Sequence, residues 1–230
     1  MSNFLLLFLL QIISGLSQIE DNCIGKIKGI PSSSEKFIMI QFRHFEFKDM
    51  MGFCPGSLDN LVQDLCRRNG NFDILKNSIM MKVDGKFSNE RFNLATRKLA
   101  YPYEYVTNGE ILKETKLPTK SKFYSSLKQQ DVTQDEYDHA VMFWETFGCN
   151  TMAGFSMKYC HLDSLLAACV FFEMRDFFYE WGGLDAPRYL GLPGLAQDLF
   201  LKQTKVKVKL MTDKKMVDLV GNEKTYKNAT

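Results

Sequence analysis

The sequence lacks the short motifs by which several large enzyme classes are recognised. No Gly-x-Gly-x-x-Gly loop and no Walker A loop are present, so nucleotide binding of those kinds has no support. A Gly-x-Ser-x-Gly nucleophile elbow is also missing, which leaves Ser-His-Asp and Cys-His catalysis open but without a motif. The six cysteines form no Cys-x-x-Cys pair and the three histidines share no metal-ligand spacing, so a zinc site is not expected.

Strong charge bias is absent as well. The chain has 230 residues, 45% of them hydrophobic and 24% charged, and its net charge is +2. This balance is typical of a globular chain with one or two cores, and it says little about partners. The scattered cysteines favour a reducing compartment.

Two interpretations of the N-terminus stay open. Residues 4–13 are apolar, and Gly15 and Ser17 follow them like a signal-peptidase site. However, no Lys or Arg precedes the stretch, and it is too short to span a bilayer, so no membrane association is expected. The alternative is a buried helix of a longer protein. A glycosylation sequon at residues 228–230 does not decide between them.

The first third of the chain predicts strands followed by a helix. Residues 26–50 alternate apolar side chains around a polar turn at residues 32–34, and both faces are mostly apolar, which favours a covered sheet. A helix follows with Ser57 as its cap and Gly70 as its end. Residues 71–93 carry no clear pattern.

Helices dominate the rest. An extended segment around Pro102 and a loop lead to a helix with a Thr133/Glu136 capping box, which Gly148 ends. A long apolar helix then runs from Thr151 to residues 182–183, followed by a connector with a short helix. The cysteines of the long helix, Cys160 and Cys169, are interpreted as small buried side chains. Residues 205–210 alternate lysine with apolar residues like a strand. The predicted class is therefore α/β (α+β), with strands first and long helices after them.

Tyr159 and Asp163 lie one turn apart inside this long apolar helix. An unpaired buried carboxylate costs several kcal/mol, so Asp163 needs either a partner or a cleft. The structural alternative is that Asp163 only caps the helix or pairs with a neighbouring group. The functional alternative is a two-metal nuclease site, where acidic side chains hold divalent ions and a phenol orients the attacking water. At its ordinary pKa the phenol of Tyr159 is a donor, not a base.

Three basic features accompany this helix. They are Arg97–Lys98, the lysines of residues 116–122, and the Lys205, Lys207 and Lys209 series. One explanation for each feature is solvated surface. The alternative is that the three features, together with the tyrosines near Lys98, line a groove for single-stranded nucleic acid.

Taken together, the chain resembles the protein-primed family B DNA polymerases of viruses, linear plasmids and transposons. Five segments are similar in order: IPSSSEKFIMIQFRHFEFKDMMGFCPGSLDNLVQDL, TRKLAYPYEY, DEYDHAVMFWETFGCNTM, YCHLDSLLAACVF and GLDAPRYLGLPGLAQDLFLKQTKVKVKLMTD. The fourth resembles the family's third exonuclease motif, Tyr-x-x-x-Asp. The resemblance implies part of a 3′–5′ exonuclease domain with an RNase H-like fold.

The resemblance also implies site residues. Asp163 would be a metal ligand, Tyr159 would position the attacking water, and Lys98 would support the site. Ser57–Leu58 matches the family's Ser/Thr-Leu motif for single-stranded DNA literally, whereas the register of the preceding strand places Met50–Met51 there instead.

The family's first two exonuclease motifs and its polymerase carboxylates have no counterpart in the sequence. We therefore expect a fragment, with a partial exonuclease domain at residues 1–181 and a connector towards a polymerase domain at residues 182–230. Whether it is an enzyme is left open: by resemblance it belongs to a DNA polymerase with a 3′–5′ exonuclease, and we expect it to be inactive alone.

The implied cofactor is Mg²⁺ or Mn²⁺, not held tightly, and the implied partners are a single-stranded DNA 3′ end and a terminal protein. The implied location is the nucleus or cytoplasm. The alternatives are a non-enzymatic nucleic-acid-binding remnant, or a secreted protein whose signal peptide is residues 1–17.

Overall fold

The computed structural model describes residues 28–33, 36–42, 45–126, 129–209 and 212–218. It is a mixed α/β structure in which helices predominate and the few strands are antiparallel, which confirms the predicted class. The apolar stretch at residues 4–13, the candidate signal peptide and the sequon all lie outside the described residues.

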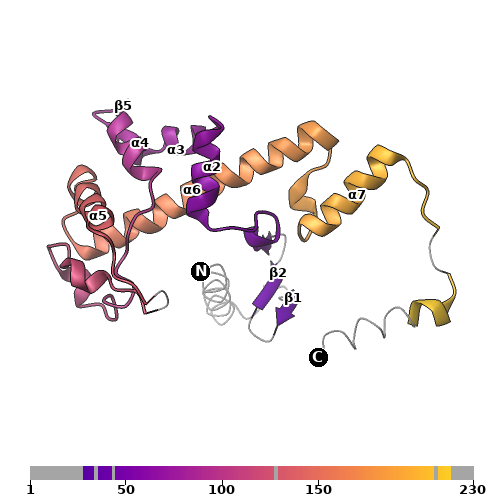
Figure 1. Cartoon of the computed structure of the whole chain (residues 1–230), viewed down its shortest axis with the longest axis horizontal. Coiled ribbons are helices and arrows are strands. Elements are labelled where there is room, and N and C mark those ends of the chain that lie inside the picture. The colour runs from indigo at the N-terminus through magenta and orange to yellow at the C-terminus, as the bar shows by residue number, and fades with distance from the viewer. Residues whose placement is uncertain (1–27, 34–35, 43–44, 127–128, 210–211, 219–230) are drawn as a thin grey trace, which may run out of the picture.

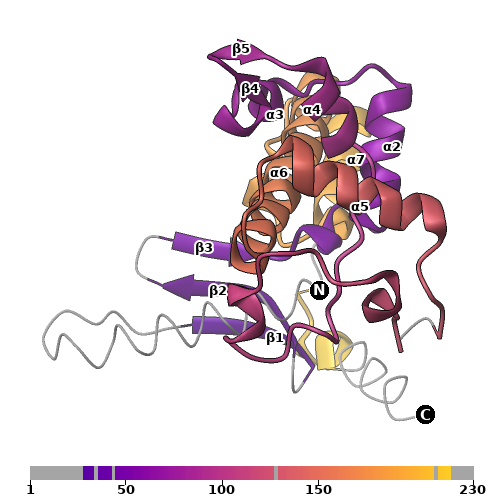
Figure 2. The same cartoon turned by 90° about the vertical axis from the view of Figure 1, so that its left-hand side faces the viewer.

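The predicted strands form one small sheet. β1 (Lys28–Ser33), β2 (Lys36–Phe42) and β3 (Phe45–Lys48) are antiparallel neighbours in the order β1-β2-β3, and Figure 2 shows them side by side beneath the helices. Among the sheet residues whose burial the structure describes, only Ile40 is buried, while Phe45 is 66% exposed. The expectation of a sheet covered on both faces is therefore wrong for these residues.

The helix after the sheet begins where its cap predicts. A short 3-10 turn, η1 (Met50–Gly52), leads to α2 (Leu58–Arg67), whose first turn is capped by Ser57: its Oγ accepts from the Asn60 N–H at 3.2 Å. The apolar stripe of α2 faces the core. The helix ends before the predicted Gly70, because Asn69 takes the left-handed conformation first (φ 51°).

Residues 71–93, which carried no clear pattern, lie in a series of short elements. These are α3 (Asp73–Asn77), η2 (Ile79–Met81), a hairpin of β4 (Lys82–Val83) and β5 (Lys86–Phe87), and α4 (Asn89–Ala95).

Arg91 on α4 ties this region to the rest of the helical body. Its guanidinium donates to the carbonyls of Met80, Lys82 and Thr146 at 3.1, 2.8 and 3.1 Å. The same group lies over the ring of Phe147, 5.3 Å from its centre. One arginine therefore joins the hairpin region to the end of the next long helix.

The two long central helices also have the predicted boundaries. After η3 (Ile111–Lys113) and η4 (Lys120–Phe123), α5 (Gln134–Thr146) starts with the Thr133/Glu136 capping box, and Gly148 follows it at φ 60°. α6 (Met152–Gly182) runs for 31 residues from a Thr151 cap to left-handed Gly183. Figure 1 shows α6 running from the region of α5, past α2, to the turn that precedes α7.

The chain turns back after α6. η5 (Ala186–Arg188) and α7 (Leu192–Thr204) follow, and Leu195 of α7 belongs to the same buried core as Phe143 and Phe155. Gly182 lies close to α7, because a side chain here would place its Cβ 2.0 Å from Cδ1 of Leu199 and the Leu199 side chain would have to move. The division of the chain at residue 182 stays a prediction.

Two local predictions are wrong. The Lys-Val alternation at residues 205–209 is not a strand; these residues are exposed and have no regular secondary structure. Cys160 is exposed, whereas Cys169 is buried as predicted.

Candidate functional site

Tyr159 and Asp163 are paired on α6. They lie one turn apart and are both partly buried, and the Tyr159 hydroxyl lies close enough to the Asp163 carboxylate to affect its pKa. Burial raises the pKa of Asp163, and the neighbouring Tyr159 hydroxyl opposes that rise only in part. The carboxylate that the apolar helix keeps therefore has a partner, but it remains more costly to ionise than an exposed one.

A tyrosine-rich segment packs against this pair. The ring of Tyr101 stacks on the ring of Tyr159, with centroids 4.8 Å apart, and its hydroxyl lies 2.8 Å from the Ser156 hydroxyl. The hydroxyl of Tyr103 lies 2.6 Å from that of Tyr159. Three tyrosines and Asp163 thus form one cluster, which we call the tyrosine–aspartate cluster (Tyr101, Tyr103, Tyr159 and Asp163).

The protons of the cluster follow from the donor count. A phenol has one proton to donate, so if Tyr159 donates to Asp163, its oxygen must accept from Tyr103. Burial raises the pKa of Tyr103, and burial together with the bonds to Tyr103 and Asp163 raises the pKa of Tyr159 far above its usual range. Both phenols therefore stay protonated at neutral pH and act as donors.

Lys98 is exposed, and no ion pair joins it to Asp163 in the part of the chain that the structure describes. The residues around Lys98 are held by His139, whose Nε2 lies 3.0 Å from the Leu94 carbonyl oxygen. Burial lowers the pKa of His139, which favours the neutral ring that donates to this carbonyl. The role of Lys98 stays a prediction.

Ser57 and Leu58 have structural roles that do not need DNA. The Ser57 hydroxyl caps α2, and Leu58 packs partly buried against the core. Their DNA-binding role is not tested by these contacts. In the alternative register, Met50 lies elsewhere, in a pocket beside α6.

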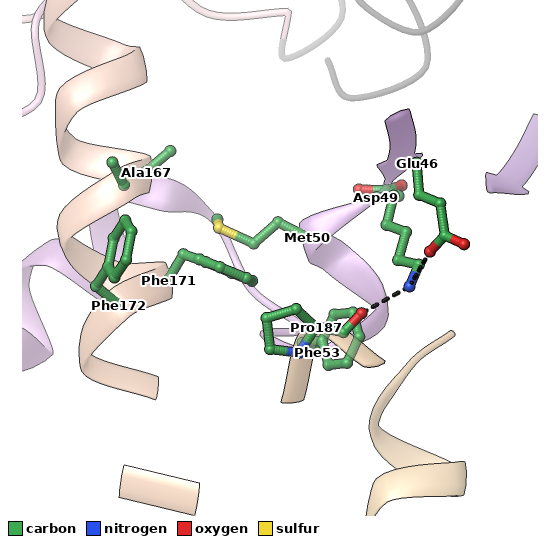
Figure 3. A pocket seen from close by; sticks show the side chains of 10 residues that line it. Glu46, Asp49, Met50, Phe53, Ala167, Phe171, Phe172 and Pro187 are labelled. Carbon is green, nitrogen blue, oxygen red and sulfur yellow. Dashed lines mark hydrogen bonds and ion pairs between the residues drawn. The ribbon is translucent and has the colours of Figure 1, made fainter. Parts of the chain in front are cut away.

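That pocket, of about 590 Å³, lies between the sheet, α6 and η5 (Figure 3). Its apolar walls include Met50, Ala167 and Phe171, and Glu46 and Lys48 line its polar side. Lys48 Nζ is 2.8 Å from the Glu46 carboxylate and donates to the Pro187 carbonyl at 2.6 Å. Ala167 is one turn beyond Asp163, so the pocket and the tyrosine–aspartate cluster lie along the same side of the helix.

The described residues do not complete a metal centre. No group of three His, Cys, Asp or Glu side chains that could hold an ion occurs among them. Asp163 supplies one carboxylate, and Asp49 of the pocket already accepts from the Met51 N–H at 2.9 Å. A two-metal site needs several acidic ligands, so these residues alone do not fit one.

The basic features are distributed around the helical body. Arg97 pairs with Asp135 at 2.7 Å, and Lys122 lies over the ring of Tyr105, 5.4 Å from its centre. The Tyr105 hydroxyl donates to both oxygens of the Glu114 carboxylate.

Within the described segments, no helix is long and apolar enough to cross a bilayer.

Sequence reasoning did not find the contacts of Tyr101 and Tyr103. It placed these tyrosines near Lys98 as base-stacking side chains, whereas the structure stacks Tyr101 on Tyr159 and bonds Tyr103 to it. The alternation of tyrosines at residues 101, 103 and 105 is the available signal. It does not show which helix they contact.

Comparison with known proteins gives no relative: no family model, no curated protein and no solved structure matches the chain.

Proposed function

We propose that the chain forms part of the 3′–5′ exonuclease domain of a protein-primed family B DNA polymerase. In this proposal α6 carries the third exonuclease motif of an RNase H-like fold, and the segment around Pro102 belongs to the same site. The observation that supports it most is the tyrosine–aspartate cluster: the motif residues Tyr159 and Asp163 are neighbours on α6, and the 101–105 segment packs directly on Tyr159.

The proposed roles follow from the environment of each group. Asp163 is the carboxylate for a divalent ion, because a desolvated carboxylate attracts a cation more strongly than a hydrated one. Tyr159 stays protonated, and once a divalent ion occupies the Asp163 carboxylate its single proton would orient a water or a phosphate oxygen. When bound, Mg²⁺ or Mn²⁺ would supply the activation of water and the stabilisation of the leaving oxygen.

The proposed substrate is the 3′ end of single-stranded DNA. Tyr103 is half-exposed beside the motif, so it offers a ring face for a base, as proteins that bind single strands do. Lys98 precedes Tyr103 by five residues and would contact phosphate. A terminal protein as partner, and a place in the nucleus or cytoplasm, belong to the same proposal and rest on the sequence resemblance.

Photo-crosslinking of an oligonucleotide to the full chain tests this proposal. A photoreactive base would be placed at the 3′ end of one single strand and at the 5′ end of another, with Mn²⁺ present. The expected result is a crosslink to residues 101–105 or 156–163 from the 3′ probe alone.

The Asp163→Asn variant should lose the Mn²⁺ dependence of this crosslink. Asp176→Asn, a matched change at an exposed position of the same helix, should keep it. Crosslinks that form equally from the 3′ and the 5′ probe and do not depend on Asp163 would instead favour the non-enzymatic nucleic-acid-binding alternative.

A further inference from the structure

The core-facing side of α6 continues beyond the core. Leu162, Leu166 and Val170 are buried where α2 and α3 pack against the helix. Phe177 and Trp181 follow Val170 by seven and eleven residues, so they lie on the same face. Figure 1 shows the end of α6 extending past α2 and α3.

The two aromatic side chains on this extension are uncovered. Phe177 is 55% exposed and Trp181 is 57% exposed, and their rings stack with centroids 5.9 Å apart. Before these rings, the Glu173 carboxylate of α6 accepts from the Asn71 N–H, in the connection between α2 and α3, at 3.2 Å. Stacked aromatics exposed in this way are typical of an interaction surface.

The same surface is acidic. Asp176 and Glu180 are exposed beside the aromatic pair, and residues 176–182 contain no lysine or arginine. We name Asp176, Phe177, Glu180 and Trp181 the α6 end surface. Direct contact between two copies of this surface would oppose like charges, which disfavours it.

A complementary segment leaves the molecule nearby. α7 ends beside α6, where Lys202 Nζ donates to the Gly183 carbonyl at 3.2 Å. Residues 205–209 then form an arm of three lysines and two valines, with Val206 51% and Val208 65% exposed. In the described part of the chain none of the three lysines has an ion pair.

We propose that two copies of the chain exchange these arms, so that residues 205–209 of each copy bind the α6 end surface of the other. The valines cover the stacked rings of Phe177 and Trp181, and the lysines face Asp176 and Glu180. A second copy is favoured because the arm already runs away from its own α6 (Figure 1), so that exchange requires no unfolding. The arrangement is a closed two-fold dimer with two equivalent contacts.

A charge-swap experiment with the full chain tests this exchange. Variant one carries Asp176→Lys and Glu180→Lys, and variant two carries Lys205→Glu, Lys207→Glu and Lys209→Glu. Light scattering should show that the dimer fraction of the natural chain rises with protein concentration and falls in high salt. Each variant alone should be monomeric, because its arm and its α6 end surface carry charge of the same sign.

Mixing the two variants should restore the dimer, since each arm then meets a surface of opposite charge. A monomeric natural chain at every concentration would overturn the proposal. A mixture that stays monomeric would also overturn it, if a single chain carrying all five changes is as compact as the natural chain. That result would place the arm on its own α6.

Two further variants test whether the effect is specific to this contact or results from the change in net charge. Asp138→Lys with Glu145→Lys makes the same change of net charge on α5 and should leave the dimer intact. Trp181→Ala removes an exposed side chain, so it should keep the helical content and raise the dimer Kd by about tenfold or more, as loss of an aromatic anchor does. An unchanged Kd for Trp181→Ala would also contradict the exchange.

Discussion

The hydroxyl oxygens of Tyr103 and Tyr159 lie 2.6 Å apart, beside the carboxylate of Asp163. Residues 56 positions apart thus share one short hydrogen bond, in which either hydroxyl can donate.

Removing the Tyr103 hydroxyl should weaken this arrangement. Tyr103→Phe is expected to lower the free energy of unfolding by about 0.5–1 kcal/mol, the low end for a hydrogen bond, because the side chain is half-exposed. Urea denaturation monitored by circular dichroism measures the change. Tyr124→Phe, an exposed tyrosine outside the cluster, should change stability by less, and equal losses would argue that the bond is not formed in solution.

Replacing Asp163 should stabilise the chain at neutral pH. Because burial raises its pKa in the folded state, Asp163 favours folding only while it is protonated, below its unfolded pKa of about 3.9. That contribution is lost as the pH rises through the raised folded pKa. Asp163→Asn cannot ionise, so it should melt at a higher temperature than the natural chain at pH 7.

The pH dependence is the diagnostic part of that prediction. The gap between the Tm values of Asp163→Asn and the natural chain should close as the pH falls towards about 4. Asp176→Asn, at an exposed position of α6, should show no such closing gap. A natural chain more stable than Asp163→Asn at pH 7 would mean that the Tyr159 bond outweighs burial.

Arg91 should be hard to replace. Arg91→Lys loses the planar group that reaches three carbonyls and covers the ring of Phe147, so the free energy of unfolding should fall by about 2–3 kcal/mol. The control is Arg67→Lys, which changes an exposed pair with Asp64 and should cost less than about 0.5 kcal/mol. Similar losses for both variants would contradict the joining role of Arg91.

The chain alone should not shorten DNA. Asp163 is a single carboxylate, and Mg²⁺ demands near-octahedral geometry and releases its waters reluctantly, so one ligand would hold it only loosely. The measurement is incubation of the purified chain with a 5′-labelled single strand and Mg²⁺ or Mn²⁺, beside Asp163→Ala. Stepwise shortening by the natural chain but not by Asp163→Ala would show that a further acidic residue completes the site.

Helix boundaries were predictable because they depend on neighbouring residues. Ser57, Thr133 and Thr151 cap their helices through bonds within three residues, and Gly148 and Gly183 follow helices in the left-handed region that glycine adopts without strain. The hairpin at residues 82–87 was missed although its signal is present. Asp84 and Gly85 both take positive φ, as the Asp-Gly pair of a tight hairpin turn requires.

Predictions that depend on distant residues were less successful. The Lys-Val alternation at residues 205–209 has the period of a strand, but a strand needs a neighbour to accept its hydrogen bonds, and periodicity does not supply one. Likewise the pairing of Tyr159 with Asp163 follows from helical spacing, whereas the contact with Tyr103 depends on how residues 96–105 cross α6. That path is set by tertiary packing.

The length of α6 has a mechanical consequence. Tyr159 and Trp181 are 22 residues apart on one uninterrupted helix, or about 33 Å at 1.5 Å per residue. No proline or bulge interrupts it, so the helix transmits a tilt as a stiff lever does. A rotation of a few degrees at the Asp163 end would sweep the Trp181 end through an arc of one to two ångströms, as this length multiplied by the angle gives. Spin labels at the two ends of α6 would keep their mutual distance during that motion, whereas the distance from the Trp181 end to a third label on α5 would change.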